Sequence, residues 1–108
     1  MNNMQKFLSK AQKLQSQLSK TQAELELKEV MGTSGAGMIR ITMTLKGDVK
    51  SVSINKEIIN TDEVEVLEDL VLVAFRDAKQ KADTLFSEGM KQAGGGDIDM
   101  SKWLEGRF

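Results

Sequence analysis

Four lysines near the amino terminus are the residues of this sequence whose type and spacing most clearly suggest binding chemistry. They are Lys6, Lys10, Lys13 and Lys20, and the first 23 residues around them contain no aspartate or glutamate. On a helix, which turns by about 100° per residue, all four fall on one flank. A row of ammonium groups without competing carboxylates can contact nucleic-acid phosphates with little sequence preference. The row is also compatible with a solvated helix face or, less well, with a membrane surface, because the apolar side is narrow.

Three basic residues in the second half of the chain are weaker candidates for contact with a polyanion. They are Arg76, Lys79 and Lys81, and they alternate with Asp77 and Asp83. Nearby carboxylates reduce the positive field that such residues present, so we expect the amino-terminal lysines to dominate.

The glycine-rich stretch from Met31 to Met38, MGTSGAGM, raises the question of a phosphate-binding loop. Such a loop opens a helix and is followed by Lys and then Ser or Thr, whereas here Met38 and Ile39 follow the last glycine. The next residues alternate between apolar and polar, which is typical of a half-buried strand. The stretch is therefore predicted to be a hairpin turn in which glycines adopt positive φ.

The composition argues against catalysis and against metal or cofactor binding. The chain has no histidine and no cysteine, which removes the most frequent general base, thiolate chemistry and the most frequent transition-metal ligands. The carboxylates between Asp62 and Asp69 have no histidine partner and fit a helix start. No membrane-spanning run or signal peptide is visible. We expect a soluble intracellular protein that is not an enzyme, with no cofactor, no membrane partner and no small-molecule substrate.

The pattern of residues predicts an α+β fold. Residues 3–27 favour a helix, because they lack Gly and Pro and are rich in Gln, Lys, Leu and Ala. Strands are predicted at residues 29–33, 38–46 and 49–54, joined by tight turns into an antiparallel meander. A second helix is predicted from about Asp62, where Asn60, Thr61 and Asp62 offer N-caps, to about Met90.

The first predicted helix also has an apolar seam with alternating spacings of three and four residues. This pattern is typical of a coiled coil and indicates packing against one other helix, although an ordinary core-facing amphipathic helix fits as well. Alternating apolar residues of the second strand are also predicted to pack. The seam comprises Met4, Phe7, Ala11, Leu14, Leu18, Thr21 and Leu25, and the strand residues are Ile39, Ile41 and Met43.

Residues 1–93 are predicted to form one domain, and residues 94–108 a glycine hinge and a carboxy-terminal tail. The tail contains Trp103, Leu104 and Phe108. These apolar groups suit either docking on the domain or binding to a partner, and the sequence does not separate the two.

Several short segments occur in a characteristic order along the chain. They are residues 4–15 (MQKFLSKAQKLQ), 22–25 (QAEL), 32–37 (GTSGAG), 67–70 (LEDL), 74–78 (AFRDA) and Lys81. Together they resemble the YbaB/EbfC family of small bacterial nucleoid-associated DNA-binding proteins. Three departures from the family are visible: Ile54-Asn55-Lys56 replaces Ile-Asp-Pro, Arg76 replaces the usual Asn, and the tail has no proline.

The resemblance implies a homodimer of α-β-β-β-α subunits whose long helices project as arms from a joined sheet. It also implies double-stranded DNA as the partner, bound by basic side chains on the helices, with a role in nucleoid organisation or gene expression in the cytoplasm. The alternative is a protein-interaction adaptor or chaperone-like clamp that uses Leu14, Leu18 and the Trp103 tail instead of the lysines.

Overall fold

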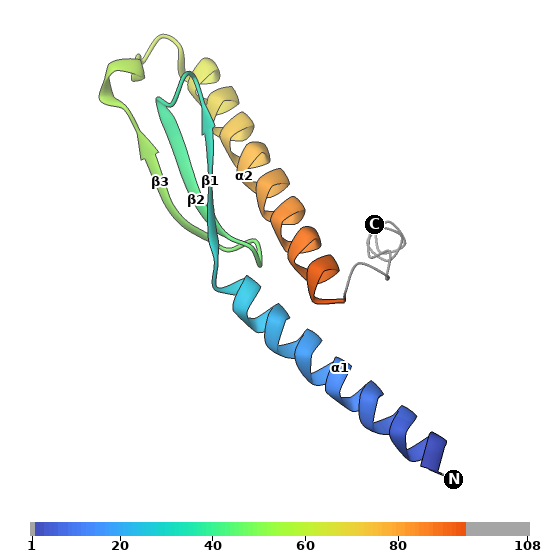
Figure 1. Cartoon of the computed structure of the whole chain (residues 1–108). Coiled ribbons are helices and arrows are strands. Elements are labelled where there is room, and N and C mark those ends of the chain that lie inside the picture. Colours follow the sequence, from blue (N-terminus) through green and yellow to red (C-terminus); the bar gives the residue numbers. More distant parts are fainter. Residues whose placement is uncertain (1, 95–108) are drawn as a thin grey trace. The chain divides into compact units, whose positions relative to one another are not determined.

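The computed structural model describes residues 2–94, which form two long helices and one three-stranded sheet (Figure 1). The α-β-β-β-α order predicted from the sequence is confirmed, and a short 3-10 helix that was not predicted follows the last strand. The elements are α1 (Asn2–Glu26), β1 (Glu29–Ser34), β2 (Ile39–Thr44), β3 (Val49–Ile54), the 3-10 helix η1 (Lys56–Ile58) and α2 (Val64–Ala93).

The described residues divide into two compact units that share helix α2. One unit, Glu26–Leu85, holds the sheet and most of α2, and we call it the sheet unit. The described part of the other comprises residues 2–25 and 86–94, which are α1 and the last turns of α2, and we call it the helical unit. The expected boundary between a domain and a tail at Gly94 lies at the edge of the described residues and stays a prediction.

The sheet is an antiparallel meander in the order β1-β2-β3. The glycine-rich stretch begins within β1 and continues into the turn that joins β1 to β2, where Gly35, Ala36 and Gly37 have φ angles of 58°, 58° and 88°. The Gly37 N–H donates to the Ser34 carbonyl at 3.1 Å and closes the turn. Three successive residues in the left-handed region explain why glycines are needed here, and the prediction of a turn instead of a phosphate-binding loop is confirmed.

Helix α2 packs closely against β1 because the residues at their contact are small. A side chain at Gly32 would collide with the backbone of α2 at Ala74 and Ala78. Ala74 and Ala78 are themselves fully buried, and the β2 residues predicted to pack share this core. Those residues are Ile39, Ile41 and Met43, which are 0%, 2% and 0% exposed.

The outer edge of β1 forms hydrogen bonds with the two members of an ion pair on α2. The Thr33 N–H donates to Asp77 Oδ2 at 2.9 Å, and Lys81 Nζ donates to the Met31 carbonyl at 2.9 Å. Asp77 and Lys81 also pair with each other at 3.0 Å. The Thr33 hydrogen bond and then the Lys81 ammonium hold the pKa of Asp77 below its ordinary value of 3.8. Two polar groups of the edge backbone, the Thr33 N–H and the Met31 carbonyl, are therefore satisfied without another strand.

Strand β3 forms the opposite edge and is largely exposed (Figure 1). Its residue Val52 pairs with Ile41 and so lies on the face that α2 covers elsewhere. Yet Val52 is 51% exposed. Helix α2 lies against β1, so its cover does not extend to β3.

Helix α2 begins at Val64, later than the predicted start near Asp62. The predicted cap residue Asn60 instead accepts a hydrogen bond from the Asp62 N–H at 2.9 Å. The first helical hydrogen bond joins the Leu67 N–H to the Glu63 carbonyl at 3.3 Å. Asn60 therefore stabilises the turn that precedes the helix, which is a common alternative use of an asparagine side chain.

The Asp77 contacts should make a pH-dependent contribution to stability. Because the folded-state pKa is below 3.8, the carboxylate stabilises the fold above about pH 4, and this contribution is lost as the pH falls through the lowered pKa. Asp77→Asn should lower the free energy of unfolding at neutral pH, and its difference from the wild type should shrink on acidification. Urea unfolding across a pH series measures both.

Asp83→Asn is the matched control, because the one ion pair of Asp83 within residues 2–94 is with Lys79, at 3.8 Å on the exposed side of the same helix. Its effect should be small at every pH. A difference for Asp77→Asn that stays constant down to pH 2 would contradict the role assigned to the carboxylate.

Candidate nucleic-acid interface

The four amino-terminal lysines lie on the exposed surface of α1. The helix forms because residues 2–26 contain no glycine or proline and consist mainly of good helix formers. At 100° per residue the four side chains span a sector of about 80°, and a rise of 1.5 Å per residue places Lys6 and Lys20 about 21 Å apart. All four lysines are exposed.

No acidic side chain neutralises this row among the described residues. The first acid in α1 is Glu24, one turn after Lys20, and no ion pair within 4 Å joins any of the four lysines to a described residue. Their ammonium groups are thus presented to solvent. The row that the spacing predicted is present, and its charge is uncompensated within residues 2–94.

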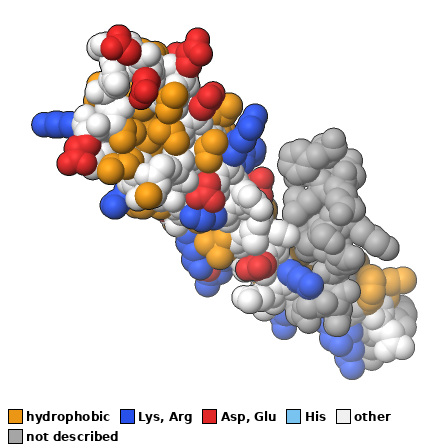
Figure 2. Space-filling model, turned by 90° about the horizontal axis from the view of Figure 1, so that it is seen from above, with side chains coloured by type: hydrophobic (Ala, Val, Ile, Leu, Met, Phe, Trp, Pro, Cys, Tyr) orange, Lys and Arg blue, Asp and Glu red, His pale blue; other side chains and the backbone are white. Residues whose placement is uncertain are grey.

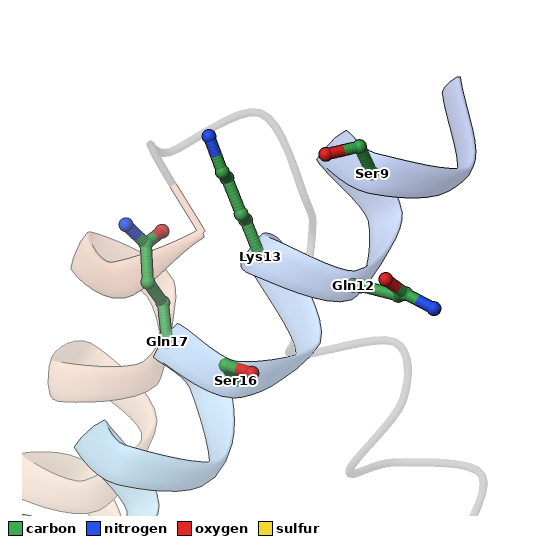
Figure 3. Close-up of a pocket in the computed structure, with 5 residues that line it drawn as sticks. All are labelled: Ser9, Gln12, Lys13, Ser16 and Gln17. Carbon is green, nitrogen blue, oxygen red and sulfur yellow. The ribbon is translucent and has the colours of Figure 1, made fainter. Parts of the chain in front are cut away.

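An open hollow of about 430 Å³ lies on the polar side of α1 (Figure 3). Lys13 and Gln17 extend in the same direction from successive turns. The described lining carries hydroxyl and amide groups beside one ammonium, which are donors that phosphate oxygens accept. The hollow is wide open to solvent, whereas a small-molecule site encloses most of its ligand, so it is better suited to an extended polyanion. The lining residues are Ser9, Gln12, Lys13, Ser16 and Gln17.

The three cations predicted on α2 lie in the sheet unit, and two of them are engaged with acids. Lys81 is held by Asp77 and by the β1 backbone, and Lys79 lies 3.8 Å from Asp83. Arg76 is exposed and forms no ion pair with a described residue. The i,i+4 spacing of Asp77 and Lys81 could have predicted their pairing from the sequence, but not their contact with the edge of β1.

The apolar seam of α1 changes from buried to exposed along the helix. Leu25 is 5% exposed and touches the last turns of α2 at Gly89, where an added Cβ would lie 2.5 Å from Leu25 Cδ2. Leu18 is half-buried, whereas Leu14, Phe7 and Met4 are 39%, 69% and 66% exposed. The seam therefore packs within the chain at one end only. Trp103, on which the adaptor alternative also depends, lies outside the described residues.

Two features of residues 2–94 bear on membrane insertion and on metal binding. Neither α1 nor α2 combines the length and apolar character that crossing a bilayer requires. In the same residues no three acidic side chains lie close enough to hold a metal ion together.

A chain with the α-β-β-β-α order and an exposed lysine row on its first helix has the features of a small DNA-binding protein. The family model of the YbaB/EbfC DNA-binding family matches residues 1–97. The chain belongs to this family.

Curated relatives with similar sequences are called nucleoid-associated proteins. One from Rhodospirillum rubrum is 41% identical over 96 residues, which cover 89% of this chain and 90% of that protein. One from Francisella tularensis is 44% identical over 109 aligned positions and covers 98% and 96% of the two chains. One from Methylocella silvestris is 40% identical over 91 residues, with coverage of 84% and 85%.

A solved structure shares the fold. It is the crystal structure of the uncharacterized protein HP0035 from Helicobacter pylori, with a TM-score of 0.60 and 13% sequence identity. The match covers 72% of this chain and 82% of that one. At this identity the likeness supports the α-β-β-β-α architecture alone.

The attachment of α1 to the end of α2 should depend on Leu25. Leu25→Ala removes a buried side chain and leaves a cavity against Gly89, so we expect the free energy of unfolding to fall by about 2–4 kcal/mol. Leu14→Ala, the same change at an exposed position of the same helix, should cost less than about 1 kcal/mol. Urea unfolding at one protein concentration compares them. Equal costs would contradict the packing described for Leu25.

Proposed function

We propose that the protein binds double-stranded DNA mainly through contacts between the α1 lysines and backbone phosphates, with little sequence specificity. The observation that carries the proposal is the exposed lysine row without a carboxylate partner among the described residues. Membership of a DNA-binding family and relatives named for the nucleoid support DNA as the polyanion and the nucleoid as its place in the cell.

The dimensions of the row suit a nucleic-acid backbone. Phosphates of one DNA strand follow each other at about 3.4 Å along the helix axis, so a row of about 21 Å spans roughly six of them. A lysine that approaches a phosphate releases condensed counterions and gains affinity without reading a base. Base readout in the major groove uses mostly arginine, asparagine and glutamine. Helix α1 has no arginine, and its two asparagines are its first two residues, so its five glutamines are the side chains of this kind along its length.

The distribution of charge explains how a chain with a net charge of −1 can bind a polyanion. The first 23 residues carry four lysines and no acid, whereas the remaining residues carry 11 basic and 16 acidic side chains. A field of opposite sign on the two parts attracts DNA to α1 and disfavours its approach to the rest of the chain. We infer that this separation orients the protein on DNA.

The salt dependence of DNA binding tests the proposal. Replacing Lys6, Lys10, Lys13 and Lys20 by glutamine should weaken binding to unrelated duplexes to a similar degree. It should also reduce the slope of log K against log salt by about 0.9 for each phosphate that a lysine no longer neutralises. Gel-shift titrations of several duplexes across a salt series measure both quantities.

A charge-matched control is available in the sheet unit and its connection to α1. Lys28, Lys46, Lys50 and Lys56 are four exposed lysines, and their replacement by glutamine changes the net charge equally. This variant should keep the wild-type slope within experimental error. An unchanged slope in the α1 variant, or an equal reduction in both variants, rules out the proposed contacts.

We also propose that two copies associate through the β3 side of the sheet unit, so that the lysine row is duplicated by a twofold axis. Strand β3 is an edge without a neighbouring strand among the described residues, and such an edge can pair with another chain. The side chains next to it are apolar and exposed, since Val52, Leu72 and Phe75 are 51%, 46% and 37% exposed.

The positions of Leu72 and Phe75 on α2 support this surface. Counted at about 100° per residue, they lie on the flank of the helix opposite to Asp77 and Lys81. The Asp77 flank contacts β1, which places the Leu72 flank on the other side of α2. Figure 2 shows hydrophobic side chains gathered into a patch with charged side chains of both signs around it, which is the usual anatomy of an interface with a polar rim.

Sedimentation of two matched variants tests the association. Val52→Glu places a charge in the proposed interface and should shift the protein towards the mass of a single chain. Val73→Glu should not, because Val73 is equally exposed, at 52%, but lies on the Asp77 flank of α2. Far-UV circular dichroism confirms that both variants are folded. A wild-type protein that sediments as a single chain, or a Val73→Glu variant that dissociates equally, would refute the β3 surface.

A further inference from the structure

The amino-terminal half of the α1 seam is an apolar stripe that no described residue covers. It comprises Met4, Phe7, Ala11 and Leu14, and we call it the open seam. Met4, Phe7 and Leu14 are 66%, 69% and 39% exposed, and Ala11 is exposed as well. Single exposed apolar residues are normal, but a continuous stripe on a helix usually has a partner.

The rest of the seam shows what kind of element covers it. Within the helical unit the last turns of α2 lie against Leu25 at Gly89, Met90 is 8% exposed, and Leu18 and Thr21 are half-buried. Helix α2 ends at Ala93. Burial of the seam therefore stops close to the place where the covering helix stops.

The chain continues from that place with residues 95–108, which are rich in apolar side chains. The distance along α1 from Leu18 to Met4 is about 21 Å at 1.5 Å per residue. Fourteen residues reach about 46 Å when extended, so the segment is long enough to follow the open seam. Gly94, Gly95 and Gly96 permit a change of direction. The apolar residues of the segment are Ile98, Met100, Trp103, Leu104 and Phe108.

Charge favours this segment over a second copy of α1 as the occupant of the open seam. Two α1 helices packed seam to seam would bring together two segments that each carry four lysines and no acid before Glu24. Coiled coils use opposite charges beside the seam, and like charges destabilise them. Residues 97–108 instead supply Asp97, Asp99 and Glu105 against Lys102 and Arg107, which leaves a net charge of −1 opposite the lysines of α1.

We propose that residues 97–108 dock on the open seam of α1 in the same chain, with their apolar side chains on Phe7 and Leu14 and their acids towards the flanking lysines. The segment thus completes the cover that α2 begins, and it occupies the side of α1 next to the lysine row. This interaction does not depend on DNA binding and can be tested without DNA.

Trp103 reports the docking directly, because it is the only tryptophan of the chain. Trp103 should be shielded from acrylamide in the wild type. Leu14→Ser should raise its quenching constant at least twofold and shift its emission to longer wavelength. Leu8→Ser is the matched control, since Leu8 is 54% exposed but lies about 80° from the centre of the open seam. Leu8→Ser should leave both readings unchanged.

Cross-linking then identifies the chain that supplies the segment. The chain contains no cysteine, so a Leu14→Cys, Leu104→Cys double variant has two thiols that a short bis-maleimide can join. Cross-linking within one chain supports the proposal, whereas a covalent dimer as the main product overturns it. A Trp103 that is freely quenched in the wild type, or equal effects of Leu14→Ser and Leu8→Ser, also overturns it.

Discussion

The close approach of α2 to β1 determines the arrangement of the sheet unit. It requires that Gly32 have no side chain and that the facing helix residues, Ala74 and Ala78, be small. At this separation Asp77 and Lys81 reach the backbone of β1, and the Ser34 hydroxyl donates to the Leu70 carbonyl at 2.5 Å. A helix placed over β1 and β2 buries the apolar residues of β2 completely and leaves β3 bare. The position of α2 therefore accounts both for the buried core and for the exposed apolar surface.

Much of the fold could be predicted from the sequence because its signals are local. The alternation in β2, the glycines of the first turn and the absence of helix breakers in α1 each act over a few residues. The prediction of the start of α2 was wrong because a side chain there can form alternative hydrogen bonds. Asn60 can cap a helix or stabilise a turn, and here its side chain accepts a hydrogen bond within the turn that precedes Val64. The 3-10 helix η1 is too short to carry a periodic pattern.

The candidate site was predictable to a different degree on the two helices. The row on α1 follows from spacing alone, since helical geometry fixes which side chains share a flank. The α2 cations could not be judged in this way, because Lys81 is held by a carbonyl of a strand that lies 50 residues earlier. The length over which the seam is buried could not be predicted from the sequence either. Its burial ends between Leu18 and Leu14, and this point depends on where α2 ends.

The ion pair of Asp77 and Lys81 has a consequence for the size of any assembly built on this sheet. Because these side chains hold the Thr33 N–H and the Met31 carbonyl, another strand could add to this edge of β1 only by displacing them. Within residues 2–94, β3 is the edge strand without such contacts. An assembly that joins sheets at β3 alone pairs two chains and stops there, because growth into fibres needs a second accessible edge in each chain.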